Sequence, residues 1–303
     1  MPNPREIHMH MRSIKNIQQI TKAMKMVAAA RLRRAQEKAA SSRPFAEKIQ
    51  SMLLTAVGDK FTLGNISSAD VPLLVQRPIR KLGYIVITSD KGLAGPYNSN
   101  VLKHAAMELM DKDEYTLITV GRKAKEYFTR RGYDVTKDFF GFSDKPTFAD
   151  ADMVADEACR LFTSGAVDEV ILIYTKFKSA LSFTPVSMHL LPVVAPQVDT
   201  SGKGTAGAGG FAGEAKGDVI FEPSTTATLK YLVPYYVKTV IYAALMQSSA
   251  SELGARMTAM SSATDNANDL LKALELSYNK ARQAGVTREI NEIVGGAEAL
   301  QQD

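Results

Sequence analysis

The C-terminal part of the chain carries a heptad pattern over a length that a compact fold does not need. From Leu253 onward, seam positions recur alternately four and three residues apart, which is the 3.5-residue period of a coiled coil. These positions are Leu253, Met257, Met260, Thr264, Ala267, Leu271, Leu274, Tyr278 and Ala281. A helix from near Val233 to Ala299 would be about 100 Å long at roughly 1.5 Å per residue. We therefore expect a rod that reaches beyond any globular domain.

The N-terminal segment predicts a second long helix. Its apolar residues recur at threes and fours and form one narrow stripe, made of Ile7, Met11, Ile14, Ile17, Ile20, Met24 and Val27. Pro4 suits a first helical turn, and neither proline nor glycine follows before Pro44. Beyond Pro44 the pattern predicts that the helix resumes from Phe45 to Val57 and ends at Gly58.

The net charge of +5 is concentrated in this N-terminal helix. Eleven Lys and Arg residues stand against three Glu residues between Arg5 and Lys48. Such a surface favours an acidic neighbour: nucleic acid, anionic lipid or an acidic protein loop.

Between the two helices the apolar pattern changes to that of alternating strands and helices. Lys81 to Asp90 is a short apolar run that ends in turn residues, typical of a strand buried on both faces. The alternation that follows predicts βαβ units around a mostly parallel, Rossmann-like sheet. Helices are expected at Asn98–Met110, Arg122–Arg131 and Phe148–Phe162, and further strands at Tyr115–Val120, Val135–Phe140, Val170–Tyr174 and Phe183–Leu191.

The expected organisation is therefore helix, α/β domain, helix. We assign residues 1–58 to the N-terminal coiled-coil helix, 59–80 to a connector, 81–195 to the α/β domain, 196–218 to a Gly-rich flexible loop and 219–303 to the C-terminal coiled-coil helix. The loop contains the low-complexity stretch Asp199–Gly217, which shows no hydrophobic period.

The sequence does not predict an active site or a metal or cofactor site. Glycines follow the first strand in Ser89–Asn98, but neither the GxGxxG spacing nor the ending of a phosphate loop is present. The four histidines are dispersed, and the single cysteine, Cys159, permits no internal disulfide. No apolar stretch is long enough to span a membrane, and no signal sequence is expected.

Three blocks of sequence resemble the gamma subunit of the rotary F-type ATP synthase, bacterial type. They are "MRSIKNIQQITKAMKMVAAARLRRAQ" (residues 11–36), "SDKGLAGPYNSN" (residues 89–100) and "YNKARQAGVTREINEIVGGAEAL" (residues 278–300). The resemblance implies that the two terminal helices form an antiparallel, left-handed coiled coil. It also implies a non-catalytic rotor shaft that couples transmembrane proton flow to ATP synthesis or hydrolysis.

The partners implied by this resemblance are three alpha and three beta subunits, the epsilon subunit and the c-ring of the membrane sector. The implied location is the cytoplasmic face of the bacterial plasma membrane, as a peripheral protein without direct membrane insertion. The residues expected to contact these partners are Lys22, Met24, Lys25, Arg31, Arg33, Arg34, Arg256, Arg282, Gln283, Thr287 and Glu289. The basic members would face acidic loops of the beta subunits, and the distal four would contact a catching loop.

Two other classes of function stay open from the residues alone. A coiled-coil protein that binds nucleic acid would explain the basic helix, although the helix lacks the interleaved aromatic residues of single-strand binders. A nucleotide-dependent enzyme would explain the α/β domain.

Overall fold

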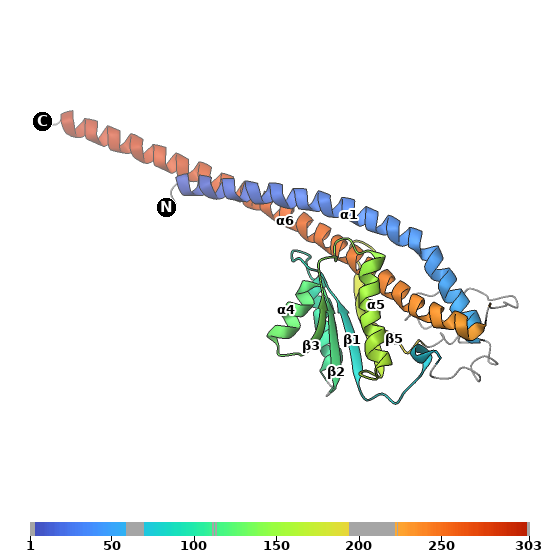
Figure 1. Cartoon of the computed structure of the whole chain (residues 1–303). Helices are drawn as coiled ribbons and strands as arrows, with labels where there is room; N and C mark the ends of the chain where they lie inside the picture. Colours follow the sequence, from blue (N-terminus) through green and yellow to red (C-terminus); the bar gives the residue numbers. More distant parts are fainter. Residues whose placement is uncertain are drawn as a thin grey trace, which may run out of the picture. The chain divides into compact units, whose positions relative to one another are not determined.

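A computed structural model describes residues 4–58, 70–110, 112, 114–193, 222 and 224–301. The chain divides into two compact units: Met1–Ala28 together with Met257–Asp303, and Ala29–Arg256. Two long helices contribute to both units, α1 (Pro4–Gly58) and α6 (Thr225–Gln301) (Figure 1). The Gly-rich stretch Asp199–Gly217 lies outside the described residues.

Helix α1 continues through Pro44, where the sequence predicted an interruption. A proline inside a helix removes one hydrogen bond and costs on the order of 3 kcal/mol. The segment after Pro44 buries Ile49, Leu53 and Ala56 in the core of the second unit, and this burial offsets the cost.

The second unit is built on a five-stranded sheet with the order β3-β2-β1-β4-β5. Its strands are β1 (Leu82–Ile87), β2 (Tyr115–Val120), β3 (Val135–Phe139), β4 (Glu169–Phe177) and β5 (Phe183–Leu191). The first four are parallel, and β5 pairs antiparallel with β4 at one edge. The predicted α/β class with a mostly parallel sheet is confirmed.

Helices cover both faces of this sheet, and strand β1 shows how the sequence specifies the layers. Its side chains alternate: Ile85 and Ile87 belong to one core, and Tyr84 and Val86 belong to the other. The first core lies under α5 (Phe148–Thr163), the short helix η1 (Pro72–Leu74) and parts of α1 and α6. The second lies under α3 (Tyr97–Leu109) and α4 (Arg122–Arg130).

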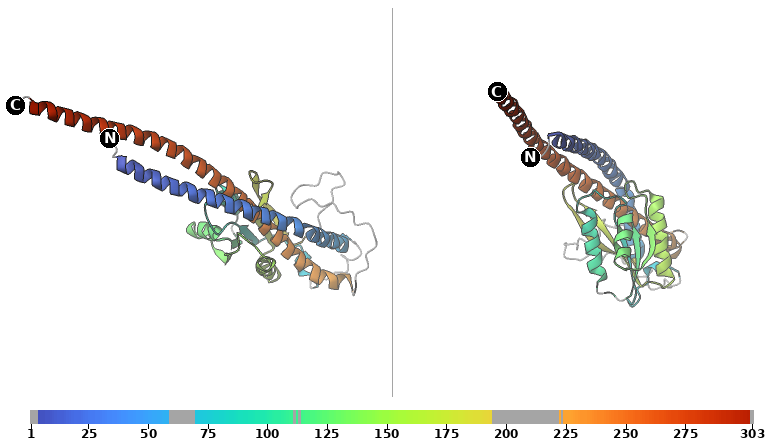
Figure 2. Two further views of the ribbon diagram at one scale, coloured as in Figure 1. Left: turned by 90° about the horizontal axis from the view of Figure 1, so that it is seen from above. Right: turned by 90° about the vertical axis from the view of Figure 1, so that its left-hand side faces the viewer.

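In the first unit, α1 and α6 run side by side in opposite directions (Figure 2). Three side-chain hydrogen bonds set the register: Lys25 to Ser261 at 2.9 Å, Thr264 to Thr21 at 2.9 Å, and Gln18 to Asn268. The rings of His8 and Tyr278 follow, with centroids 6.0 Å apart. From pair to pair the residue number falls in α1 and rises in α6, so the two helices are antiparallel, as predicted.

The seam predicted in α6 is confirmed, whereas the seam predicted in α1 is partly wrong. All nine predicted positions from Leu253 to Ala281 are buried or half-buried. In α1, however, Ile17, Ile20 and Val27 are 47%, 59% and 51% exposed. Between Arg5 and Ala28, the buried or half-buried positions of α1 are instead Ile7, Met11, Ile14, Gln18, Thr21, Met24 and Ala28.

Candidate subunit-interaction surfaces

The C-terminal end of α6 extends past the residues with which α1 can pair. The pairing of His8 with Tyr278 leaves only the first residues of α1 to contact α6 beyond Ala281. The four distal residues predicted to contact partner subunits, Arg282, Gln283, Thr287 and Glu289, are all exposed. The hydroxyl of Thr287 donates to the carbonyl oxygen of Gln283 at 2.9 Å, so its lone pairs stay available as acceptors. This end of α6 therefore presents donors and acceptors to its surroundings.

The basic residues of α1 form a mostly exposed surface. Lys22 and Arg34 are exposed, and Met24 is half-buried at the seam. Lys25 bonds Ser261, and Arg33 pairs with Glu37 of the same helix at 3.1 Å. Because the Arg33 and Glu37 side chains are 84% and 64% exposed, water screens their attraction and the pair contributes little to stability.

Arg256 differs from the other predicted contact residues because it is buried. It is 7% exposed, and its guanidinium is 2.6 Å from the Glu252 carboxylate, one helical turn away on α6. The same group donates to the carbonyl oxygen of Gly92 at 3.2 Å and lies 3.6 Å from Asp144. Arg256 therefore connects α6 to the loop after β1 and to the loop after β3.

Asp144 connects this cluster to α1. Its carboxylate lies 2.8 Å from both Arg31 and Lys91. Burial alone would raise the pKa of Asp144, but the hydrogen bond from Lys91 and the charges of Arg256 and Arg31 hold that pKa below its usual value. One carboxylate thus ties helices α1 and α6 to the loop between β1 and α3.

Glu252 is the most buried charged member of the cluster. Its side chain is 1% exposed, and burial raises its pKa to about 7 although Arg256 favours the charged form. Sequence reasoning missed Glu252 and Asp144. The spacing of Glu252 and Arg256 by four residues could have indicated the first, whereas nothing in the local sequence indicates Asp144.

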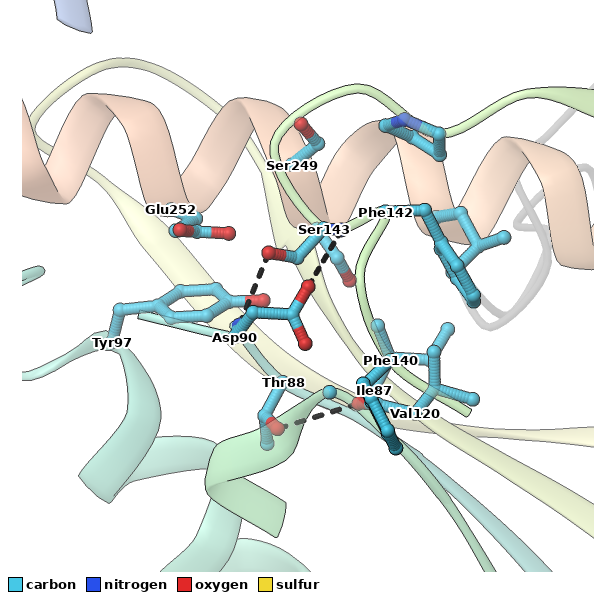
Figure 3. Close-up of a pocket in the computed structure, with 14 residues that line it drawn as sticks. Ile87, Thr88, Asp90, Tyr97, Val120, Phe140, Phe142, Ser143, Ser249 and Glu252 are labelled. Atoms are coloured by element: carbon cyan, nitrogen blue, oxygen red, sulfur yellow. Dashed lines mark hydrogen bonds between the residues drawn. The ribbon is translucent and has the colours of Figure 1, made fainter. Parts of the chain in front are cut away.

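The carboxyl ends of β1 and β2, where α/β sheets commonly bind ligands, are filled by the chain itself. The Asp90 carboxylate accepts hydrogen bonds from the backbone amides of Arg122, Gly141 and Ser143 at 3.1, 2.9 and 3.1 Å. Figure 3 shows Asp90 among Thr88, Ser143 and Tyr97, near Glu252 of α6. The cavity there measures about 10 Å³, close to the least space that holds one water molecule. A nucleotide does not fit at this position.

Gly121 allows this close packing at the start of α4. Its φ of +100° is a conformation that side chains rarely adopt, and an added Cβ would lie 2.3 Å from the carbonyl oxygen of Thr88. The hydroxyl of Thr88 in turn accepts a hydrogen bond from the amide of Ala124 at 2.9 Å. A glycine is therefore required where the end of β1 meets the first turn of α4.

Comparison with known proteins decides between the classes of function. The family model described as ATP synthase matches residues 3–300. The chain is 45% identical over 303 residues to the ATP synthase gamma chain of Heliobacterium modesticaldum, covering 99% of this chain and 100% of that one. The chain belongs to the ATP synthase gamma chain family. The identity to the gamma chain of Brevibacillus brevis is 44%, over 97% of this chain and 98% of that one.

Solved structures agree with this family. The chain is similar to a chain in the structure of the Tetrahymena thermophila mitochondrial ATP synthase that is described as central stalk and c-ring. The TM-score is 0.61 and the sequence identity is 26%, and the match covers 80% of this chain and 99% of that one. A chain of the Euglena gracilis mitochondrial ATP synthase shares the fold with a TM-score of 0.67 and 21% identity, over 98% and 94% of the two chains. The expected gamma subunit of an F-type ATP synthase is confirmed, and the nucleic-acid alternative finds no support.

The described part of the chain contains neither a membrane-spanning helix nor a cluster of metal-ligating side chains. None of its helices combines the length and the apolar character that crossing a bilayer requires. Among the same residues, no group of three or more His, Cys, Asp or Glu side chains is placed to hold a metal ion.

Proposed function

We propose that the chain is the central rotor shaft of an F-type ATP synthase, in which it carries no active site of its own. The antiparallel pair of α1 and α6, together with membership of the gamma chain family, is the observation that carries this proposal. The partners are the ring of three alpha and three beta subunits, the epsilon subunit and the c-ring. The assembly lies at the cytoplasmic face of the bacterial plasma membrane.

Exposed residues of both helices are proposed to contact the ring. Lys22, Lys25, Arg31, Arg33 and Arg34 would attract acidic loops of the beta subunits, because charge attraction tolerates sliding better than close packing does. Met24, half-buried beside them, would add apolar contact. Arg256 is buried by its own chain, and its part is to hold the loops of the α/β domain against α6.

The distal residues Arg282, Gln283, Thr287 and Glu289 are proposed to bind a catching loop of the ring. Each hydrogen bond to such a loop contributes about 1 kcal/mol net, so the contacts can form and break at every step. Their exposure at the unpaired end of α6 supports this role.

The experiment is reconstitution with alpha and beta subunits. The chain should elute with both in size-exclusion chromatography, and it should hydrolyse no ATP when it is alone. In membrane vesicles that contain the complete complex, Arg282→Ala/Gln283→Ala should lower coupled ATP synthesis with assembly intact. Lys272→Ala, at an exposed position of the same helix, is the control and should leave synthesis unchanged. Failure to co-elute would refute the proposal that the chain is the rotor shaft. Unchanged synthesis in the double variant would refute the proposed binding of the distal residues to a catching loop.

A further inference from the structure

A hollow in the second unit is lined by an excess of positive charge. It has a volume of about 410 Å³ and lies between α1, the loop after β3 and α6. We call it the basic hollow; its charged and hydroxyl-bearing lining residues are Arg31, Arg34, Lys38, Asp144, Lys145 and Ser249.

The positions on α1 place three cations on one side of the hollow. Arg31, Arg34 and Lys38 are three and four residues apart, so they lie on the same face of the helix. Ala35 sits between them and is 8% exposed, packed beside Leu253 of α6. A small side chain at this position leaves space between the cations, which a bulky residue would fill.

The single carboxylate in the hollow does not balance these charges. Asp144 already contacts Arg31, Lys91 and Arg256. Arg34, Lys38 and Lys145 form no ion pair with any residue that the structure describes. The hollow therefore has uncompensated positive charge, and the side chains of Arg34, Lys38 and Lys145 have no carboxylate partner within the described chain.

A buried hydroxyl in the wall also has no partner. Ser249 is 3% exposed, and its oxygen forms no hydrogen bond to the described residues. Figure 3 shows this hydroxyl directed away from Asp90 and Ser143. An unsatisfied buried hydroxyl costs about 1–3 kcal/mol, and serines in helices commonly avoid this by bonding the preceding turn. A ligand oxygen in the basic hollow would supply the missing acceptor.

We propose that the basic hollow binds an oxyanion of the phosphate class. Apart from the Asp144 carboxylate, whose buried Oδ1 accepts no hydrogen bond, the unpaired groups that it offers are hydrogen-bond donors or cations, which are the complement of a multiply charged oxyanion. The guanidinium of Arg34 can bind two oxygens, Lys38 and Lys145 supply point charges, and Ser249 donates from the wall. The volume accommodates orthophosphate and diphosphate alike, and the greater charge of a diphosphate pairs with more of the cations. This inference goes beyond the shaft function, and it shares Arg31 and Arg34 with the surface proposed above to attract acidic loops of the beta subunits.

The test uses the full chain and calorimetric titration with pyrophosphate and with orthophosphate at constant ionic strength. Saturable binding of one anion per chain is expected, tighter for pyrophosphate. Arg34→Ala/Lys38→Ala should weaken it about tenfold or more, because two charge-assisted contacts are lost. Ser249→Ala should weaken it several-fold without lowering the thermal unfolding temperature of the anion-free chain, because the hydroxyl that it removes has no partner there.

The matched control is Lys15→Ala/Lys22→Ala, which removes the same net charge from exposed positions of α1 outside the hollow. It should leave the affinity within about twofold of the parent. Equal weakening by both double variants would mean diffuse attraction and overturn the site, as would unsaturable binding or an unchanged affinity in Ser249→Ala. A glutamate-rich peptide that binds the hollow and is not displaced by pyrophosphate would overturn the proposal in favour of an acidic protein segment.

Discussion

Replacing Arg256 by alanine should destabilise the chain far more than removing an exposed arginine. At about pH 8, above its pKa of about 7, Glu252 is ionised, and its side chain is 1% exposed. Without Arg256 that carboxylate is left unpaired in the interior. Breaking a buried pair from one side costs about 3–5 kcal/mol. For a domain of this size that corresponds to a fall in unfolding temperature of about 6 °C or more.

Circular dichroism during thermal and urea unfolding measures this loss. Arg33→Ala is the control, because its pair with Glu37 is exposed and contributes about 1 kcal/mol or less. Replacing both partners, as Glu252→Leu/Arg256→Met, should cost less than Arg256→Ala alone, because no buried charge remains. The cost of Arg256→Ala should also shrink near pH 5, where Glu252 is protonated in both proteins. A cost at pH 8 no larger than that of the Arg33 control would refute the reasoning.

Three further predictions follow from the second unit. Burial raises the pKa of Glu252 from 4.5 to about 7, so the stability that this residue contributes is present below about pH 4.5 and is lost as the pH rises through 7. In a series of urea unfolding curves, Glu252→Gln should remove up to about 3 kcal/mol of this decline in the free energy of unfolding. A parallel decline in both proteins would contradict the prediction. Gly121→Ala should cost about 3 kcal/mol or more through its positive φ and its contact with Thr88, whereas Gly92→Ala, with open space around it, should cost under about 1 kcal/mol; equal unfolding temperatures would exclude the strain. Leu53→Ala, at a residue 3% exposed, should lower the free energy of unfolding by about 2–5 kcal/mol, and a loss below 1 kcal/mol would show that the end of α1 contributes little to the core.

The order of helices and strands could be predicted from the sequence because local patterns determine it. The apolar runs became β1 to β5, and the seam from Leu253 to Ala281 became the contact face of α6. The antiparallel edge strand β5 could not be assigned a direction, because pairing direction depends on the chain's path and not on local periodicity.

The prediction of the α1 seam was partly wrong, for a physical reason. Two stripes on this helix satisfy a spacing of three and four, and hydrophobicity alone favours the one that contains Ile17 and Ile20. The helix instead buries Gln18 and Thr21, because Asn268 and Thr264 offer them hydrogen bonds across the seam. Such a match is visible only when both helices are aligned.

The ion cluster around Asp144 could not be predicted from the sequence either. Arg256, Asp144 and Lys91 are distant in the chain and meet only because the loops after β1 and β3 lie at the same edge of a parallel sheet. A basic residue in a basic protein is expected at the surface, so the interior position of Arg256 required the fold to be known.

The unequal lengths of the two helices in the first unit have a mechanical consequence. Up to about Ala281, two helices bonded to each other resist twisting together. Beyond that point α6 continues alone for most of its remaining length to Gln301. A single helix is softer in torsion than a bonded pair. A torque applied at this end would therefore first twist the last turns of α6 elastically, before it turned the stiffer paired segment.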